Sequence, residues 1–208
     1  MDALAAAGRT LCTARPRKLH PMLANPRPLA LAAWPGSLLW QVALAAAGSA
    51  LIALGAQVAV PLPFSPVPVT GQTFAVLLVA SALGRLGIAS VVLYIGEGAL
   101  GLPVFAGGAF GAARLVGPTG GYLAGFVLAA FVLAWCVDRG FDRRFGTALL
   151  AMITAEVAIY ACGVLWLARF PLAVSPLDAG LYPFIPGDLL KLVAAGLALP
   201  LAWRIVRR

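Results

Sequence analysis

The stretch from Pro186 to Trp203, Pro-Gly-Asp-Leu-Leu-Lys-Leu-Val-Ala-Ala-Gly-Leu-Ala-Leu-Pro-Leu-Ala-Trp, places Asp188 and Lys191 at the start of an otherwise apolar run. The run is typical of a membrane-embedded helix, where each ionisable side chain costs about 2.5–3.5 kcal/mol. Charges kept at that cost usually face a cavity, a partner or a substrate. A spacing of three puts both side chains on one helix face. We therefore predict that Asp188 and Lys191 form a binding site.

Two structural roles compete with this prediction. Asp188 precedes the apolar run directly after Pro-Gly, and aspartate is a favoured N-cap residue. The pair can also be a structural ion pair, although such pairs add little net stability once desolvation is counted. A ligand with a urea or amide edge would suit the pair, because a carboxylate accepts from N–H groups and an ammonium donates to a carbonyl.

The composition indicates an integral membrane protein. Hydrophobic residues make up 62% of the chain, charged residues 11%, and the mean hydropathy is +0.97. The formal charge of +8 comes from short basic clusters between apolar runs, which favours orientation in a membrane over binding of nucleic acid. The three cysteines are unclustered and predict neither disulfides nor a metal site.

The apolar runs predict an all-α fold, with six transmembrane helices in one compact bundle formed by residues 38–208. Residues 1–37 are predicted to be a basic cytoplasmic leader that is poorly ordered. Two of the runs are short and need flanking residues to span the hydrocarbon, which brings polar groups close to membrane depth. The expected spans are 38–60, 67–83, 86–100, 122–137, 147–168 and 189–203.

The distribution of basic residues predicts that both termini are cytoplasmic. With this orientation, all but three of the 15 Lys and Arg residues lie on the inner side, as the positive-inside rule requires. The long connections 61–72, 101–121 and 169–187 then emerge outside. They are rich in Gly and Pro, and irregular backbone at membrane depth is tolerated where it lines a cavity. We therefore expect these loops to roof an outward-facing ligand pocket.

Several further side chains are candidates for this pocket. Arg114, in the glycine-rich outer loop, has the forked donors that clamp a ligand carboxylate, or it snorkels at the interface. Glu97 and Glu156 lie near membrane depth and either bind ligand, carry a proton or hydrogen-bond between helices. The aromatic candidates also serve packing or interface roles. The remaining expected pocket residues are Gln72, Phe105, Phe110, Tyr122 and Tyr160.

Small residues form stripes along the first predicted helix, and Ala46 and Ala50 belong to one of them. Such stripes let another helix approach closely, either from a partner subunit or within the bundle.

The sequence contains few motifs of enzymes. There is no ATP-binding Gly-x-x-x-x-Gly-Lys-[Ser/Thr] loop, and the single histidine, His20, lies in the leader. We therefore expect no catalysis, no metal and no cofactor, with an intramembrane enzyme that uses the acids as the rival.

Five strings in order resemble the BioY family of biotin transporters, over residues 38 to 208. They are Ala56-Gln57, Pro68-Val-Thr-Gly-Gln-Thr-Phe74, Gly101-Leu-Pro-Val-Phe-Ala-Gly-Gly108, Gly117-Pro-Thr-Gly-Gly-Tyr-Leu123 and Pro183-Phe-Ile-Pro-Gly-Asp-Leu-Leu-Lys191. The resemblance implies the substrate-binding S component of an energy-coupling factor (ECF) transporter. It also implies six helices in the bacterial inner membrane, with biotin bound near the outer surface beneath the loop after the first helix.

By this resemblance, Asp188 and Lys191 contact the ureido ring of biotin, and Arg114 contacts its carboxylate. Ala46 and Ala50 fit the family's partner-binding motif. The implied partners are an energy-coupling transmembrane protein and two ATPase subunits, with toppling of the S component carrying biotin inward. The resemblance further implies that some members work without these partners, as oligomers. The alternatives are an S component for another small vitamin and a proton-coupled vitamin carrier that acts alone.

Overall fold

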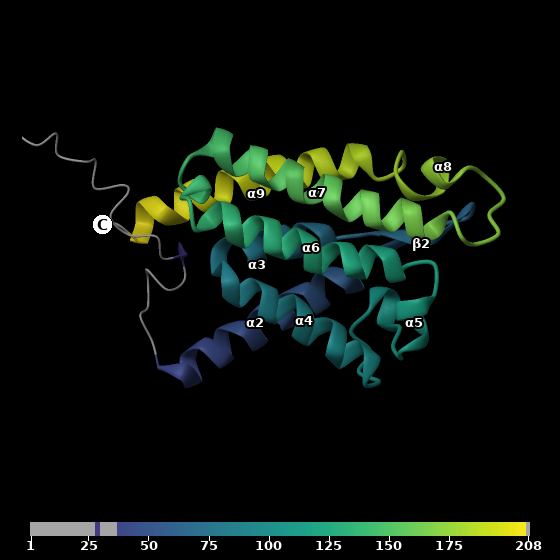
Figure 1. Ribbon diagram of the computed structural model, residues 1–208, viewed down its shortest axis with the longest axis horizontal. Helices are drawn as coiled ribbons and strands as arrows, with labels where there is room; N and C mark the ends of the chain where they lie inside the picture. The colour runs from purple at the N-terminus through teal and green to yellow at the C-terminus, as the bar shows by residue number, and fades with distance from the viewer. Residues whose placement is uncertain (1–27, 30–36, 207–208) are drawn as a thin grey trace, which may run out of the picture.

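The structure is a computed structural model that describes residues 28–29 and 37–206 (Figure 1). Except for residues 28, 29 and 37, the predicted leader lies outside the described residues. Within the described part, helices dominate, as the all-α prediction requires. The helices of 12 or more residues are α2 (Leu38–Gln57), α3 (Gln72–Leu83), α4 (Arg85–Ala99), α6 (Gly120–Val137), α7 (Phe145–Leu167) and α9 (Ile185–Val206).

Four segments in the described residues are long and apolar enough to cross a membrane. They are α2, α6, α7 and the stretch Pro176–Val206, which joins the short α8 (Pro176–Gly180) to α9. By contrast, α3 and α4 have 12 and 15 residues. At 1.5 Å per residue they reach only about 18 and 23 Å, less than the roughly 30 Å of bilayer hydrocarbon.

The proline-rich segment after α2 forms a β-hairpin. Strands β1 (Ala59–Leu62) and β2 (Ser65–Thr70) pair antiparallel, with Val60 opposite Val69 and an irregularity before Leu62. Proline lacks an N–H donor and clashes inside a helix, but it is tolerated in edge strands, and both strands here are edges. The predicted helical span 67–83 is therefore wrong at its start, and the span 38–60 is wrong at its end, because α2 stops at Gln57.

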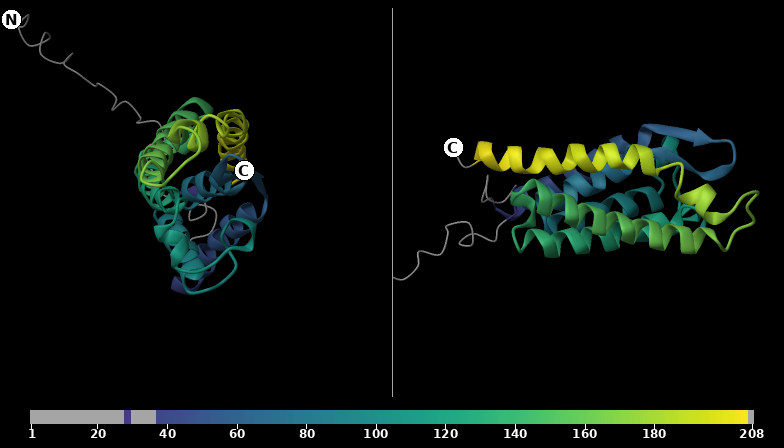
Figure 2. Two further views of the ribbon diagram at one scale, coloured as in Figure 1. Left: turned by 90° about the vertical axis from the view of Figure 1, so that its right-hand side faces the viewer. Right: turned by 90° about the horizontal axis from the view of Figure 1, so that it is seen from above.

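The connections predicted to lie outside gather at one end of the molecule. The hairpin, α5 (Ala113–Val116) and α8 lie at the right-hand end in Figure 1, and α9 ends at the left-hand end. Figure 2 shows the hairpin beside the start of α9 at the same end. The Ser65 hydroxyl fixes the hairpin to α8 by donating to the Ala179 carbonyl oxygen at 2.6 Å.

The core is built around the antiparallel pair α6 and α7, with α9 against α7 and α3, and with α2 against α3 and α4. Glycine allows the closest approach of α6 to α7. A Cβ atom at Gly125 would stand 2.8 Å from the Ile159 Cα atom, so any larger residue would force the two helices apart. The turn between them contains η3 (Phe141–Arg143) and lies at the end of the bundle remote from the hairpin.

A polar contact joins α2 to α4 in an otherwise apolar interface. The Ser49 hydroxyl is fully buried and donates to the Glu97 carboxylate at 2.6 Å. Beside it, Gly48 has no room for a Cβ atom because the Ser90 side chain fills that space. Of the roles weighed for Glu97, the structure favours hydrogen bonding between helices.

We expect Ser49→Ala to destabilise the folded protein by about 1–3 kcal/mol, because it leaves the partly buried Glu97 carboxylate without this donor. Thermal unfolding in detergent measures the effect. Thr154→Ala is the matched control, since the Thr154 hydroxyl is exposed and bonds only within its own helix, to the Leu150 carbonyl. Equal unfolding midpoints for the two variants would contradict a structural role for the Ser49–Glu97 contact.

Candidate functional site

A cavity lies beneath the hairpin, at the end of the bundle where the predicted outer connections gather. Pro66, Val67 and Pro68 of β2 form part of its wall. Besides Phe105, the wall also contains five side chains that the sequence predicts to line the pocket. These are Gln72, Arg114, Tyr122, Tyr160 and Lys191. Segments more than 100 residues apart in the chain therefore contribute to one cavity.

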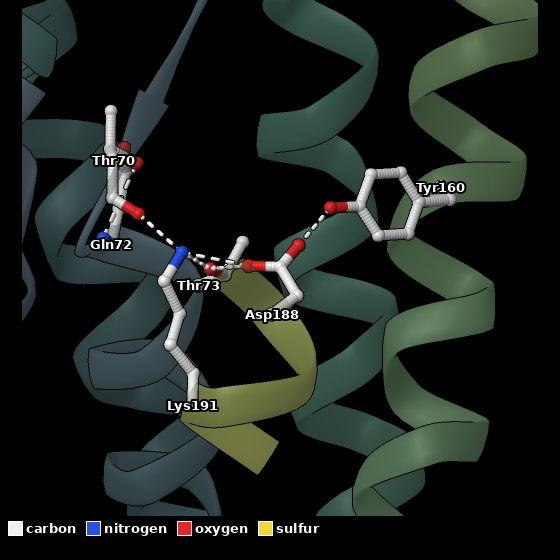
Figure 3. Close-up of polar contacts among 6 residues, drawn as sticks. All are labelled: Thr70, Gln72, Thr73, Tyr160, Asp188 and Lys191. Carbon is white, nitrogen blue, oxygen red and sulfur yellow. Dashed lines mark hydrogen bonds and ion pairs between the residues drawn. The ribbon is translucent and has the colours of Figure 1, made fainter. Parts of the chain in front are cut away.

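Lys191 is the charged centre of this wall. Its ammonium donates to the Asp188 carboxylate at 2.7 Å, to the Thr70 carbonyl oxygen at 2.7 Å and to the Thr73 hydroxyl at 3.1 Å (Figure 3). The Thr73 hydroxyl in turn donates to the same Asp188 oxygen at 3.2 Å. The Lys191 side chain is 20% exposed, so the ammonium is both held by protein and accessible from the cavity.

Asp188 lies behind this wall. It is only 3% exposed and, although predicted to bind ligand, it does not line the cavity directly. Its second carboxylate oxygen accepts a hydrogen bond from the Tyr160 hydroxyl (Figure 3). The N-cap alternative is wrong, because α9 already begins at Ile185 and the Asp188 amide donates to the Phe184 carbonyl oxygen.

Gln72 and Tyr122 are held in place by neighbouring protein groups. The Gln72 amide nitrogen donates to the Tyr94 hydroxyl at 2.8 Å, and the Tyr122 hydroxyl donates to the Gly180 carbonyl oxygen at 2.8 Å. The rings of Tyr122 and Tyr160 meet edge to face, with centroids 6.3 Å apart. The Gln72 amide nitrogen and the Tyr122 hydroxyl thus already have partners in the protein. The aromatic rings give the cavity a largely apolar surface.

Arg114 reaches the cavity from α5, whereas Lys191 reaches it from α9. Its side chain is exposed and also lines the cavity, so a ligand held at Lys191 can extend toward the guanidinium. Of the two phenylalanine candidates, Phe105 is buried and lines the cavity. Phe110 is 60% exposed and is not among the lining residues, so its prediction as a pocket residue is wrong.

Three residues of the site, Thr70, Thr73 and Phe184, were not predicted from the sequence. Thr73 stands within the string Pro68–Phe74 that was singled out, but its position gives no sign that it meets a side chain of α9. No group of three or more His, Cys, Asp or Glu side chains suited to a metal ion occurs in residues 28–29 and 37–206. The arrangement offers an anionic acceptor and a cationic donor side by side, with a second cation across an apolar cavity.

Comparison with known proteins identifies the group to which this architecture belongs. The model of the BioY family matches residues 27–208. The chain belongs to the BioY family. BioY relatives cover most of the chain. The probable biotin transporter BioY of Pyrococcus horikoshii is 40% identical over 156 residues, which are 74% of this chain and 91% of the relative.

Two further BioY proteins are similar over nearly the same extent. The biotin transporter BioY of Thermotoga maritima is 42% identical over 72% of this chain and 87% of its own length. The biotin transporter BioY of Rhodobacter capsulatus is 41% identical over 71% of this chain and 84% of its own length. The matches to these relatives support the assignment of the chain to the BioY family.

The fold is that of a solved S component. The crystal structure of the S-component for biotin from an ECF-type ABC transporter superposes with a TM-score of 0.71, and covers 82% of this chain and 92% of that chain. The sequence identity is 24%, so this likeness supports the fold alone. It confirms the mostly helical S-component architecture that the family resemblance implied.

Proposed function

We propose that this protein is the biotin-binding S component of an ECF transporter, taking biotin from the outer side of the bacterial inner membrane and delivering it inward. The observation that carries the proposal is the pairing of Asp188 and Lys191 beside the cavity. A carboxylate accepts from N–H groups and an ammonium donates to a carbonyl, and the ureido ring of biotin presents both on one edge. The names of the BioY relatives support the same substrate.

In the proposed complex, the ureido ring lies against Asp188 and Lys191, and the valerate carboxylate reaches Arg114. Tyr122 and Tyr160 cover the apolar part of the ligand, and Gln72 holds one side of the wall. Burial of both ligand ends by charged partners gives charge-assisted hydrogen bonds, which are about twice as strong as neutral ones. No cofactor takes part, and biotin is the cargo.

The proposed topology has six spans and two cytoplasmic termini, with the hairpin, α5 and α8 on the outer side. The short helices α3 and α4 then cross the bilayer together with their flanking segments, packed inside the bundle. This orientation places Arg85, Arg139, Arg143, Arg144 and Arg204 on the cytoplasmic side, in agreement with the positive-inside rule.

The proposed partners are an energy-coupling transmembrane protein and two ATPase subunits on separate chains. The proposed contact is the face of α2 that carries Ala46 and Ala50, which are exposed, whereas Gly48 and Ser49 face α4. Membrane vesicles that contain this protein alone, compared with vesicles that also contain the coupling module, measure whether ATP hydrolysis is needed for uptake. Uptake by the protein alone that stops when the proton gradient collapses would favour the carrier alternative.

Equilibrium binding of labelled biotin to the purified protein tests the proposed substrate. We expect saturable binding at one site per chain that unlabelled biotin displaces. Thiamine and riboflavin should not displace it. Displacement by another vitamin at lower concentration than biotin would show that the chain is an S component for that vitamin instead.

The proposed contact between Arg114 and the valerate carboxylate of biotin leads to a separate prediction. Arg114→Gln should weaken biotin binding by about tenfold, the effect of losing one hydrogen bond to a charged group. The same substitution should leave the binding of biotin methyl ester unchanged within about twofold, because the ester has no anionic end. Competition assays with both ligands measure the difference. Equal losses for the acid and the ester would contradict a contact between Arg114 and the carboxylate.

A further inference from the structure

Glu156 on α7 is a buried acid that the proposed function leaves unexplained. It is 6% exposed, and no donor among the described residues bonds to its carboxylate oxygens, which lie beside the Asp188 carboxyl group. Burying such a group without a donor is unfavourable, and more so when the group is charged. A leucine or methionine would fill the same space at no such cost. The position therefore suits a group that finds its partner in another state of the protein.

The location of Glu156 connects it to the ligand site. It precedes Tyr160 by four residues on α7, a spacing at which side chains on one helix face meet. It also interacts electrostatically with Asp188, Lys191 and Tyr160. Glu156 itself does not line the cavity, so it lies directly behind the side chains that do.

A ligand that hydrogen-bonds to Asp188 has to displace one of the groups that cover it. From the cavity, Asp188 is covered by Lys191, Thr73 and Tyr160, which line the wall and donate to its two oxygens. Lys191 and Thr73 share one oxygen, and Tyr160 donates to the other. Lys191 already has two other acceptors, the Thr70 carbonyl oxygen and the Thr73 hydroxyl. The Tyr160 hydroxyl donates to Asp188 alone. Displacement of Tyr160 therefore creates a buried donor that needs a new acceptor.

We propose that Glu156 is a positioning residue of the ligand site, which accepts the Tyr160 hydroxyl when Asp188 turns to the ligand. This assignment rests on the proposed function, because it assumes that an N–H group of biotin arrives at Asp188. The Glu156 carboxylate, one helical turn from Tyr160, then becomes the acceptor for the Tyr160 hydroxyl in place of Asp188. This new hydrogen bond lowers the free-energy cost of ligand entry, because the Tyr160 hydroxyl does not lose its acceptor. It also directs the Tyr160 hydroxyl away from the ligand.

A double-mutant cycle with labelled biotin tests the proposal. Glu156→Leu removes the acceptor and should weaken binding about tenfold. Glu156→Gln keeps a carbonyl acceptor and should stay within about threefold of the wild type. In the Tyr160→Phe background there is no hydroxyl to accept, so Glu156→Leu should change affinity less than about twofold. Thr154→Leu, at an exposed position of the same helix, is the control and should bind like the wild type.

Infrared difference spectroscopy gives a readout that does not depend on the stability of the leucine variant. Addition of biotin should shift a carboxyl band that is missing in Glu156→Gln, and the shift should disappear in Tyr160→Phe. Equal effects of Glu156→Leu in both backgrounds, or a band that biotin leaves unchanged, would overturn the assignment while the biotin site stands. Failure of the wild-type protein to bind biotin would overturn the proposed function and this assignment together.

Discussion

Asp188→Asn should reduce biotin affinity at least 100-fold. The substitution keeps the size of the side chain but removes the negative charge that accepts a hydrogen bond from a ureido N–H group. Hydrogen bonds to a charged group contribute about 1.5–3 kcal/mol each, and 1.4 kcal/mol corresponds to a factor of ten in affinity. It also leaves the Lys191 ammonium without the counter-charge 2.7 Å away. Equilibrium binding with purified protein in detergent measures the loss.

The control for this variant is Asp138→Asn. Asp138 forms an ion pair with Arg85, whose side chain is 83% exposed, at the end of the bundle remote from the cavity. Exposed pairs contribute about 0–1 kcal/mol, so this change should alter neither affinity nor stability appreciably. Wild-type affinity in Asp188→Asn would contradict the assignment of Asp188 to the ligand site.

The second large effect concerns both charges together. Lys191→Met should abolish measurable binding, because it removes the donor to the ureido carbonyl and leaves the buried Asp188 without its counter-charge. Breaking a buried ion pair from one side costs about 3–5 kcal/mol of stability, whereas replacing both partners by uncharged residues is often neutral. The double variant Asp188→Asn/Lys191→Met should therefore unfold near the wild-type temperature and still fail to bind biotin.

This combination separates a functional pair from a structural one. Thermal unfolding and biotin binding are measured on both single variants and on the double variant. If the pair only supported the fold, stability and binding would fall and recover together. Recovery of biotin binding in the double variant would therefore contradict a recognition role for the two charges.

The sequence predicted the helices more reliably than the segments between them. Long apolar runs, uncharged in α2 and α6 and interrupted only by Glu156 in α7, define these helices, because an apolar run of this length is typical of a transmembrane helix. The prolines of residues 61–68 excluded a helix but did not reveal pairing between Val60 and Val69, which depends on a turn and on register. For the same reason, the start of α3 at Gln72 could not be predicted from hydropathy.

The candidate site was predictable where its members are close in sequence. Asp188 and Lys191 share a helix face at a spacing of three, and the structure confirms that they contact each other. Thr70 and Thr73 lie 121 and 118 residues before Lys191, and only the packing of α3 against α9 brings them together. The role of Tyr160 as a donor to Asp188 likewise follows from tertiary packing of α7.

An experimentally determined structure of the protein with biotin tests the central claim most directly. We expect the ureido ring to lie in the cavity beneath the hairpin, with one N–H group within hydrogen-bonding distance of Asp188 and the carbonyl oxygen within that distance of Lys191. Biotin bound elsewhere, with these two side chains still paired only to each other and to the protein, would contradict it.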